Sequence, residues 1–427
     1  MDSNQILQGL TEFLRKSPGS YHAVDSVQRR LEQSGFRVLR ETDRWDLRPG
    51  DRCCVVRGGR SILSFQLPKQ TPRRFRLIAS HADSPSFKIK PGGAVISEGL
   101  TRLNVERYGG SILSTWFDRP LSIAGRVIVR ERDQIRSRLV YPERDLVLIP
   151  SLAIHLSHTG ADKELSVQTH MLPLISDDGN ELVLNRVLEE CGVDPETVLE
   201  TDLFLACRAE PTVWGANHEF YSAPRLDDLA CVYCSLEGFL NAEADEDVLV
   251  HCVFGDEEVG SNSQQGAAST FLRDVIARIC CAYSVSADER AAMLSSSFLI
   301  SADNAHAAHP AYPGVYDPVN RPRINGGIVL KRQAGYKYVT DGYSGAVIRL
   351  LCEDSGIPLQ DYTNHSDQRG GSTLGNISNT QVSMNAADIG LAQLAMHSAF
   401  ETMGAHDPAR LSVLSQSFYT HALPELL

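Results

Sequence analysis

The expected fold rests on the stretch Val248-Leu249-Val250-His251-Cys252-Val253-Phe254-Gly255-Asp256-Glu257-Glu258-Val259-Gly260-Ser261. Its first half is an apolar run bounded by a glycine, which indicates a buried strand. Glu257 and Glu258 stand just beyond the end of that strand. Neighbouring side chains at a strand end point in different directions, so one carboxylate can hold a metal ion while the other moves a proton. Taken alone, the same acidic residues are typical of a solvated turn.

Other polar side chains stand at the ends of predicted strands or at the start of a predicted helix. One strand ends at His81, another is followed shortly by Asp303, and Asp227 begins a helix. Strands that alternate with helices indicate an open, largely parallel sheet covered on both faces. Ligands of such sheets bind beyond the carboxyl ends of the strands. We therefore expect these side chains to meet Glu257 and Glu258 at one edge of the sheet.

The pattern changes between residues 92 and 218. Helical periodicity disappears there, and short β-branched runs, such as 111–117, alternate with turns, apart from a helix near 181–191. This texture predicts an all-β insertion at 92–218. The rest of the chain, 1–91 and 219–427, is then one α/β domain with three layers, α/β/α.

Further elements are expected in the last third of the chain. We expect a helix from about residue 263 and another over 343–352, with a strand and its connection within 376–387. His397 precedes or starts the last long helix.

Composition narrows the function classes. The 427 residues carry a net charge of -12, which argues against nucleic acid or an anionic membrane as the main partner. Because no apolar run reaches about 18 residues, we expect no membrane span. The first residues lack the basic and apolar regions of a signal peptide. These features predict a cytoplasmic protein.

Ten cysteines are present, mostly within apolar runs, as buried free thiols are. Cys231 and Cys234 form a single C-x-x-C inside an apolar helical pattern. Without a second pair, this spacing favours core packing over zinc or redox chemistry.

The chain offers two imidazoles and three carboxylates that suit a pair of divalent ions. Zinc and similar ions accept such nitrogen and oxygen ligands. Two ions about 3.5–4 Å apart clamp one reacting centre, and they need a bridging carboxylate. Asp227 is our candidate for the bridge, with His81 and Asp303 on one ion and Glu258 and His397 on the other. Taken singly, these residues have commoner roles as helix caps, turn formers or surface histidines.

Three nearby acidic residues would complete such a site. A water between two cations loses a proton more easily than bulk water. Glu257 can take that proton and later deliver it to a leaving group. Asp83 can orient His81 by accepting its other N–H, and Asp228 would do similar work behind the ligands.

Several segments together resemble the aspartyl aminopeptidases, a family of metallopeptidases. They occur in the family's order and cover nearly the whole chain, and the Trp-Phe-Asp-Arg and Glu-Glu-Val-Gly-Ser stretches are the most discriminating. The segments are Ser80-His81-Ala82-Asp83-Ser84-Pro85, Thr115-Trp116-Phe117-Asp118-Arg119, Arg225-Leu226-Asp227, Asp256-Glu257-Glu258-Val259-Gly260-Ser261, Ser301-Ala302-Asp303-Asn304-Ala305-His306 and Ala395-Met396-His397-Ser398.

The resemblance implies a catalytic α/β/α domain interrupted by a β-rich domain used in subunit association and dimerisation. It implies two metal ions per subunit, usually zinc, although carboxylate-rich sites also take manganese or cobalt. It also implies a homo-oligomer, a tetrahedral dodecamer built from dimers. Glu257 matches the family's general acid/base. The matching ligands are His81, Asp227, Glu258, Asp303 and His397.

The resemblance further implies a preference for peptides with an unblocked N-terminal Asp or Glu. His306, Lys331 and Tyr338 align with substrate-contacting residues, and Lys331 would supply the cation for an acidic side chain. His155 resembles a histidine that reaches a neighbouring subunit's site. Relatives usually carry Pro-Cys before Gly-Ser-Thr, where this chain has Arg369 and a glycine, so Arg369 would supplement or redirect charge recognition.

The sequence thus predicts a cytoplasmic zinc metalloaminopeptidase of the aspartyl type. It would cleave single acidic N-terminal residues from peptides by a metal-bridging hydroxide, with Glu257 as general acid/base. Two alternatives within the reaction class are a broader aminopeptidase and an N-acyl amino acid hydrolase. An inactive relative that serves as a scaffold or cargo protein is the alternative from another class. A candidate residue for every role in the site argues against it.

Overall fold

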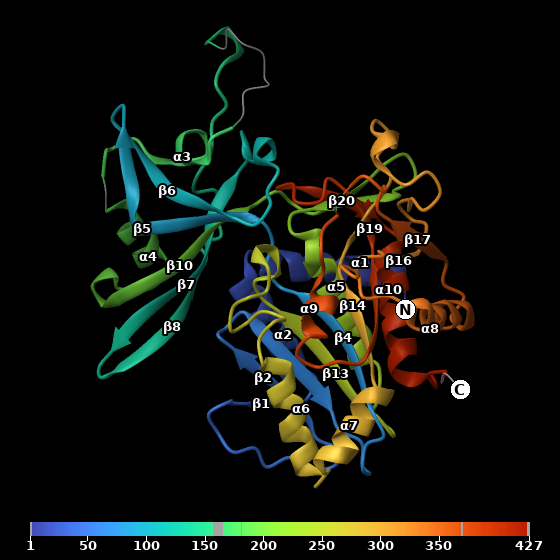
Figure 1. The fold of residues 1–427 in the computed structure, drawn as a ribbon. Helices are drawn as coiled ribbons and strands as arrows, with labels where there is room; N and C mark the ends of the chain where they lie inside the picture. The colour runs from blue at the N-terminus through green and yellow to red at the C-terminus, as the bar shows by residue number, and fades with distance from the viewer. Residues whose placement is uncertain (1, 157–164, 181, 369, 425–427) are drawn as a thin grey trace.

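The computed structural model describes residues 2–156, 165–180, 182–368 and 370–424. Its largest part is a nine-stranded sheet with the strand order β1-β2-β3-β13-β4-β14-β18-β16-β17 (Figure 1). The central strands β13, β4, β14 and β18 are mutually parallel. The bounds are β1 Arg37–Leu39, β2 Arg52–Arg57, β3 Ser61–Gln66, β4 Phe75–His81, β13 Val248–Phe254, β14 Phe298–Ala302, β16 Ile328–Arg332, β17 Leu359–Thr363 and β18 Asn385–Gly390.

Helices cover both faces of this sheet. Along β13, Leu249 and Val253 pack with helices α1, α2, α5, α8 and α10, whereas Val250 and Cys252 pack with α6, α7 and α9. Because alternate side chains of a strand point to opposite faces, a fully apolar strand indicates burial on both sides. The predicted three-layer α/β/α arrangement is confirmed. The bounds are α1 Ser3–Lys16, α2 Ser20–Gln33, α5 Leu226–Leu240, α6 Phe271–Ala282, α7 Ala287–Ser296, α8 Gly342–Asp354, α9 Leu374–Ser378 and α10 Asp407–Thr420.

A six-stranded antiparallel sheet lies beside this body, with the order β8-β7-β10-β5-β6-β9 and its own apolar cluster (Figure 1). Its strands fall between Ser86 and Cys207. The domain limits at 92 and 218, and a role in subunit association, stay predictions. The bounds are β5 Ser86–Ser97, β6 Leu100–Tyr108, β7 Leu121–Glu131, β8 Gln134–Val140, α3 Val167–His170, β9 Leu174–Ser176, α4 Val183–Glu190 and β10 Val198–Cys207.

A five-stranded sheet, which the sequence did not indicate, has the order β11-β12-β20-β19-β15. It draws short segments from three distant parts of the chain, and the loop between β19 and β20 carries His397. The bounds are β11 Thr212–Trp214, β12 Phe220–Ala223, β15 Ala305–His306, β19 Ala392–Leu394 and β20 Glu401–Gly404.

Some local expectations were wrong. The run 111–117 contains a 3₁₀ turn at Leu113–Trp116 instead of a strand. The helix expected from 263 begins at Phe271. The last long helix begins at Asp407 rather than near His397, because Pro408 favours the first turn of a helix. His397 itself has a φ of +67°, which no right-handed helix contains.

Two further features concern the cysteine pair and the length of the helices. Cys231 and Cys234 are buried free thiols within α5. In the part of the chain that the structure describes, no helix is long and apolar enough to traverse a bilayer.

Candidate metal centre

Strand and helix ends bring the candidate residues to one edge of the nine-stranded sheet. His81 is the last residue of β4, and it pairs in register with Phe254 at the end of β13. The 3₁₀ turn Glu257–Val259 follows β13 directly. Asp303 follows β14, and Asp227 lies at the start of α5. The carboxyl ends of three neighbouring parallel strands therefore meet the start of one helix.

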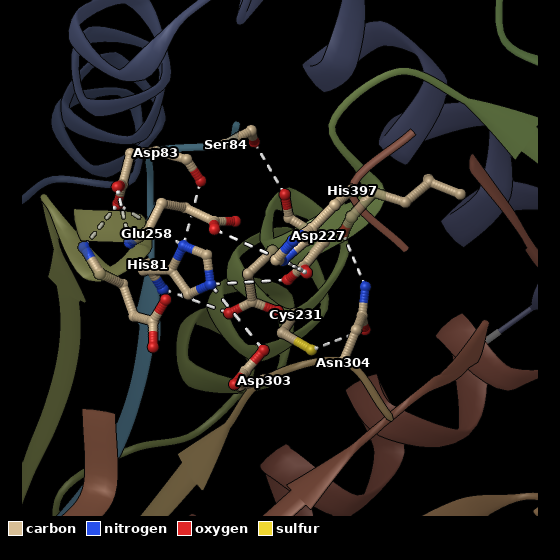
Figure 2. Close-up of polar contacts among 12 residues, drawn as sticks. His81, Asp83, Ser84, Asp227, Cys231, Glu258, Asp303, Asn304 and His397 are labelled. Atoms are coloured by element: carbon tan, nitrogen blue, oxygen red, sulfur yellow. Dashed lines mark hydrogen bonds and ion pairs between the residues drawn. The ribbon is translucent and has the colours of Figure 1, made fainter. Parts of the chain in front are cut away.

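The five candidate ligands converge around Asp227. His81 Nε2 lies 3.5 Å from Asp227 Oδ1 and 3.8 Å from Asp303 Oδ1. His397 Nε2 lies 3.5 Å from Asp227 Oδ2 and 3.4 Å from Glu258 Oε2. Figure 2 shows both imidazoles joined to Asp227 by dashed lines. Each oxygen of Asp227 thus faces a different histidine, as a bridging ligand would require.

Asp228, which we expected only to support the ligands, lies close enough to His81 and Asp303 to be a ligand itself. Ligand atoms of His81, Asp227 and Glu258 all lie within 4.8 Å of one another, and so do those of His81, Asp228 and Asp303. Asp228 Oδ2 also accepts the main-chain N–H of His81 at 3.2 Å. Asp228 therefore combines an orienting hydrogen bond with an oxygen that can face an ion.

Several buried oxygens in this cluster fit a cation. Asp227 Oδ1, Asp228 Oδ1 and Glu258 Oε1 have no hydrogen-bond partner among the described residues. A buried carboxylate oxygen without a partner is costly, and a bound cation would satisfy it. The donors are carboxylate oxygens and imidazole nitrogens, which suit zinc and also manganese or cobalt.

The pKa shifts within the cluster also favour a bound cation. Burial raises the pKa of Glu257 to about 8. Burial, reinforced by the charge of Asp227, also raises the pKa of Glu258 well above its ordinary value. Burial opposes a charged His397, but its hydrogen bond with Asp227 prevails and raises the pKa of His397 to about 8. These carboxyl groups therefore hold protons until positive charge enters the site.

Asp83 orients several of these groups at once. His81 Nδ1 lies 3.0 Å from the Asp83 carbonyl oxygen and 3.6 Å from its carboxylate. The Asp83 carboxylate accepts the main-chain N–H groups of Glu257 and Glu258, each at 3.1 Å. Burial opposes the charge on Asp83, but its interaction with His81 outweighs burial and lowers the pKa of Asp83 to about 2.

A cavity of about 130 Å³ joins the ligand cluster to the candidate substrate residues. His306, Lys331 and Tyr338 line it together with Glu257. The buried ammonium of Lys331 donates to the carbonyl oxygen of Asp303 at 2.7 Å and lies 3.4 Å from Asp303 Oδ2. Burial lowers the pKa of Lys331, but the charge of Asp303 more than compensates, so the group stays cationic.

One candidate residue lies elsewhere. His155 is exposed in the 3₁₀ turn Ile154–Leu156 and is not among the residues that line this cavity. Arg369 lies outside the described residues.

Sequence reasoning missed Glu401 and Tyr108. The buried Glu401 accepts main-chain N–H groups of both Asp227 and His397. The sequence offered one signal for Glu401, namely an acidic residue that follows His397 closely and stands next to the apolar Phe400. Tyr108 belongs to the six-stranded sheet and donates to Asp83. No local pattern marks that contact, because Asp83 lies in the loop between β4 and β5, 25 residues before Tyr108.

Comparison with known proteins identifies the class as zinc metalloprotease. The family described as Aminopeptidase I zinc metalloprotease (M18) matches residues 13–419. The chain therefore belongs to the M18 family of zinc aminopeptidases, which confirms the metallopeptidase resemblance of the motifs.

Individual relatives extend over nearly the whole chain. A protein of Clostridium acetobutylicum, named probable M18 family aminopeptidase 2, is 37% identical over 426 residues, which cover 97% of this chain and 98% of the relative. The solved complex of Ape4 and Nbr1 has a TM-score of 0.93 at 31% identity and covers 98% of this chain and 86% of its own. The mApe1 dodecamer of S. cerevisiae has a TM-score of 0.87 at 26% identity and covers 97% and 96%.

Proposed function

We propose that this M18 aminopeptidase removes unblocked N-terminal residues from peptides, with a preference for Asp and Glu. The observation that carries the proposal is the shared cavity, in which the ligand cluster, Glu257 and the buried cation Lys331 face one space. Cleavage of the peptide bond and recognition of a negative side chain would then occur in the same cavity.

Two ions would be held by ligands that share Asp227. His81 and Asp303 would complete one set, and Glu258 and His397 the other, with Asp228 as a further oxygen near the first. When bound, the ions would supply Lewis acidity toward the scissile carbonyl and toward water.

Glu257 would move the proton. Its main-chain N–H is fixed by Asp83, and its side chain lines the cavity beside His81 and Asp227. Burial raises its pKa to about 8, which suits a group that must both accept and donate a proton near neutral pH. Glu257 would take a proton from the attacking water and return it to the leaving amine.

Lys331 would select acidic residues. Its ammonium is buried, lies 5.4 Å from the centre of the Tyr338 ring, and lines the cavity with His306. The same ammonium contacts Asp303, so it also neutralises a candidate ligand. A test of acid preference must therefore separate substrate recognition from metal binding.

Kinetics on Asp-, Glu-, Leu- and acetyl-Asp-arylamides with Lys331→Met make that separation. If Lys331 pairs the substrate, kcat/KM for Asp and Glu falls about 10- to 100-fold, as loss of a charged hydrogen bond predicts, while Leu changes little. Equal zinc content in both proteins excludes an effect through Asp303. A wild-type enzyme with no preference for acidic residues would contradict the proposal, and cleavage of acetyl-Asp would indicate an N-acyl hydrolase instead.

Assembly is part of the same proposal. Leu152, Ile154 and Leu156 are 67%, 81% and 67% exposed around His155 in the single chain. Such apolar side chains favour burial against another subunit. We propose a tetrahedral dodecamer built from dimers, in which His155 reaches a neighbour's cavity. Light scattering that gives about one 46.9 kDa chain per particle would overturn it.

A further inference from the structure

We infer that Glu401 is a positioning residue that holds the main chain of two metal ligands together. Its Oε2 atom accepts the Asp227 N–H at 3.0 Å, and its Oε1 atom accepts the His397 N–H at 2.7 Å. Only 1% of Glu401 is exposed. The inference rests on the ligand set proposed above, and it assigns a role to a residue outside that set.

The two ligands come from separate parts of the fold. Asp227 lies at the start of α5, whereas His397 lies in the loop between β19 and β20. A single carboxylate that receives one N–H from each segment fixes their separation. Hydrogen bonds in a buried site are little weakened by competition from water.

The backbone of His397 needs such support. Its φ of +67° lies in the left-handed region, which non-glycine residues adopt at a cost. In that conformation, the Nε2 atom of the His397 ring lies near both Asp227 and Glu258. The 2.7 Å hydrogen bond from the His397 N–H to Glu401 holds the main chain of His397 in this conformation.

Asp83 makes the same kind of contact with two other residues of the cluster. It accepts the N–H groups of Glu257 and Glu258 with its two oxygens, as Glu401 does for Asp227 and His397. Two buried carboxylates thus each fix a pair of neighbouring functional groups through the main chain. Glu401 is expected to matter most for the ion that His397, Asp227 and Glu258 would share.

Glu401→Gln tests this role with the full-length protein. The amide keeps the size of the side chain but offers one oxygen instead of two, so one N–H loses its acceptor. Competition titration with a chromophoric chelator should show one of two zinc ions bound about 10- to 100-fold more weakly, the usual loss for a supporting partner of a ligand. Saturating zinc should restore most of kcat, which it would not do for a residue that reacts with substrate.

Asp407→Asn is the matched control. Asp407 is also fully buried and accepts two main-chain N–H groups, from Asn325 at 2.8 Å and Gly327 at 3.1 Å. Because it lies outside the ligand cluster, its substitution should lower the melting temperature without weakening zinc binding.

The outcomes separate the two proposals. Wild-type zinc affinity at both positions in folded Glu401→Gln would overturn the positioning role. A wild-type protein that binds fewer than two ions would instead contradict the ligand set. If Glu401→Gln does not fold, Glu401→Asp keeps the carboxyl group but shortens the side chain, and it must show the same selective loss of one ion.

Discussion

Tyr108 Oη, at the end of β6 in the six-stranded sheet, donates a hydrogen bond over 2.7 Å to Asp83 Oδ2, in the loop that follows β4 of the nine-stranded sheet. Tyr108 Oη also lies 2.9 Å from Asp256 Oδ1, but a hydroxyl has one proton to give. Arg60 lies 2.6 Å from Asp256 and satisfies that carboxylate. The tyrosine proton is therefore left for Asp83, and the six-stranded sheet supports the candidate metal centre of its own chain.

Tyr108→Phe should impair catalysis and stability together. The buried Asp83 carboxylate would lose one donor, at a cost of about 1–3 kcal/mol of unfolding free energy. Because Asp83 also fixes Glu257 and Glu258, we expect kcat to fall about tenfold, within the range for supporting groups of a metal site. Urea unfolding and steady-state kinetics measure both effects.

Tyr283→Phe provides the comparison for that experiment. Tyr283 donates to the Pro68 carbonyl at 2.6 Å, away from the ligand cluster. The Tyr283→Phe protein should be less stable than the wild type but should have the same kcat. An unchanged kcat in Tyr108→Phe as well would show that the hydrogen bond from Tyr108 to Asp83 does not affect catalysis.

Zinc binding should tighten as the pH rises from about 6 to 8. Burial raises the pKa of Glu257 to about 8, and the hydrogen bond with Asp227 overcomes burial to raise the pKa of His397 to about 8. A metal ion needs a neutral His397 as its ligand, and its positive charge favours an ionised Glu257, so apparent affinity gains with pH until both groups have lost their protons. Calorimetry in buffers of different ionisation enthalpy counts the released protons, and binding independent of pH would contradict this.

The metal-free protein should show the opposite trend in stability. For groups whose folded pKa is raised, stability is fully present below the unfolded pKa and is lost as the pH rises through the folded value. Glu257 and His397 both belong to this class, so the melting temperature of the chelated protein should fall as the pH rises from about 4.5, the ordinary pKa of Glu257, to about 8. Added zinc should restore it by mass action, most strongly at pH 8. Identical curves with and without chelator would indicate that no ion binds here.

Glu257→Gln should separate metal binding from turnover. The amide cannot exchange a proton, so kcat should fall about 10²- to 10⁴-fold while two zinc ions per chain remain. Glu237→Gln, at a carboxylate of α5 that pairs with Arg30, should keep full activity. Near-normal activity in Glu257→Gln would remove this residue from the mechanism.

The convergence of the ligands followed from where strands end. His81, Glu258 and Asp303 lie at or just after the ends of three neighbouring parallel strands, so the topology alone predicts that they meet. Glu401 and Tyr108 could not be placed in this way. Glu401 lies in a sheet assembled from short, distant segments, and Tyr108 reaches Asp83 in the loop between β4 and β5, so the contacts depend on pairings that leave no periodic signal in the sequence.

Mixed oligomers test whether His155 acts in a neighbour's site. His155→Ala and Glu257→Gln should each lose most activity alone. In a mixture assembled together, a His155→Ala chain keeps its own Glu257 and can receive His155 from a Glu257→Gln neighbour. Random pairing across a two-fold interface should then restore about a quarter of the wild-type rate. If His155 served its own chain, every site would lack one of the two groups, and mixing would restore nothing.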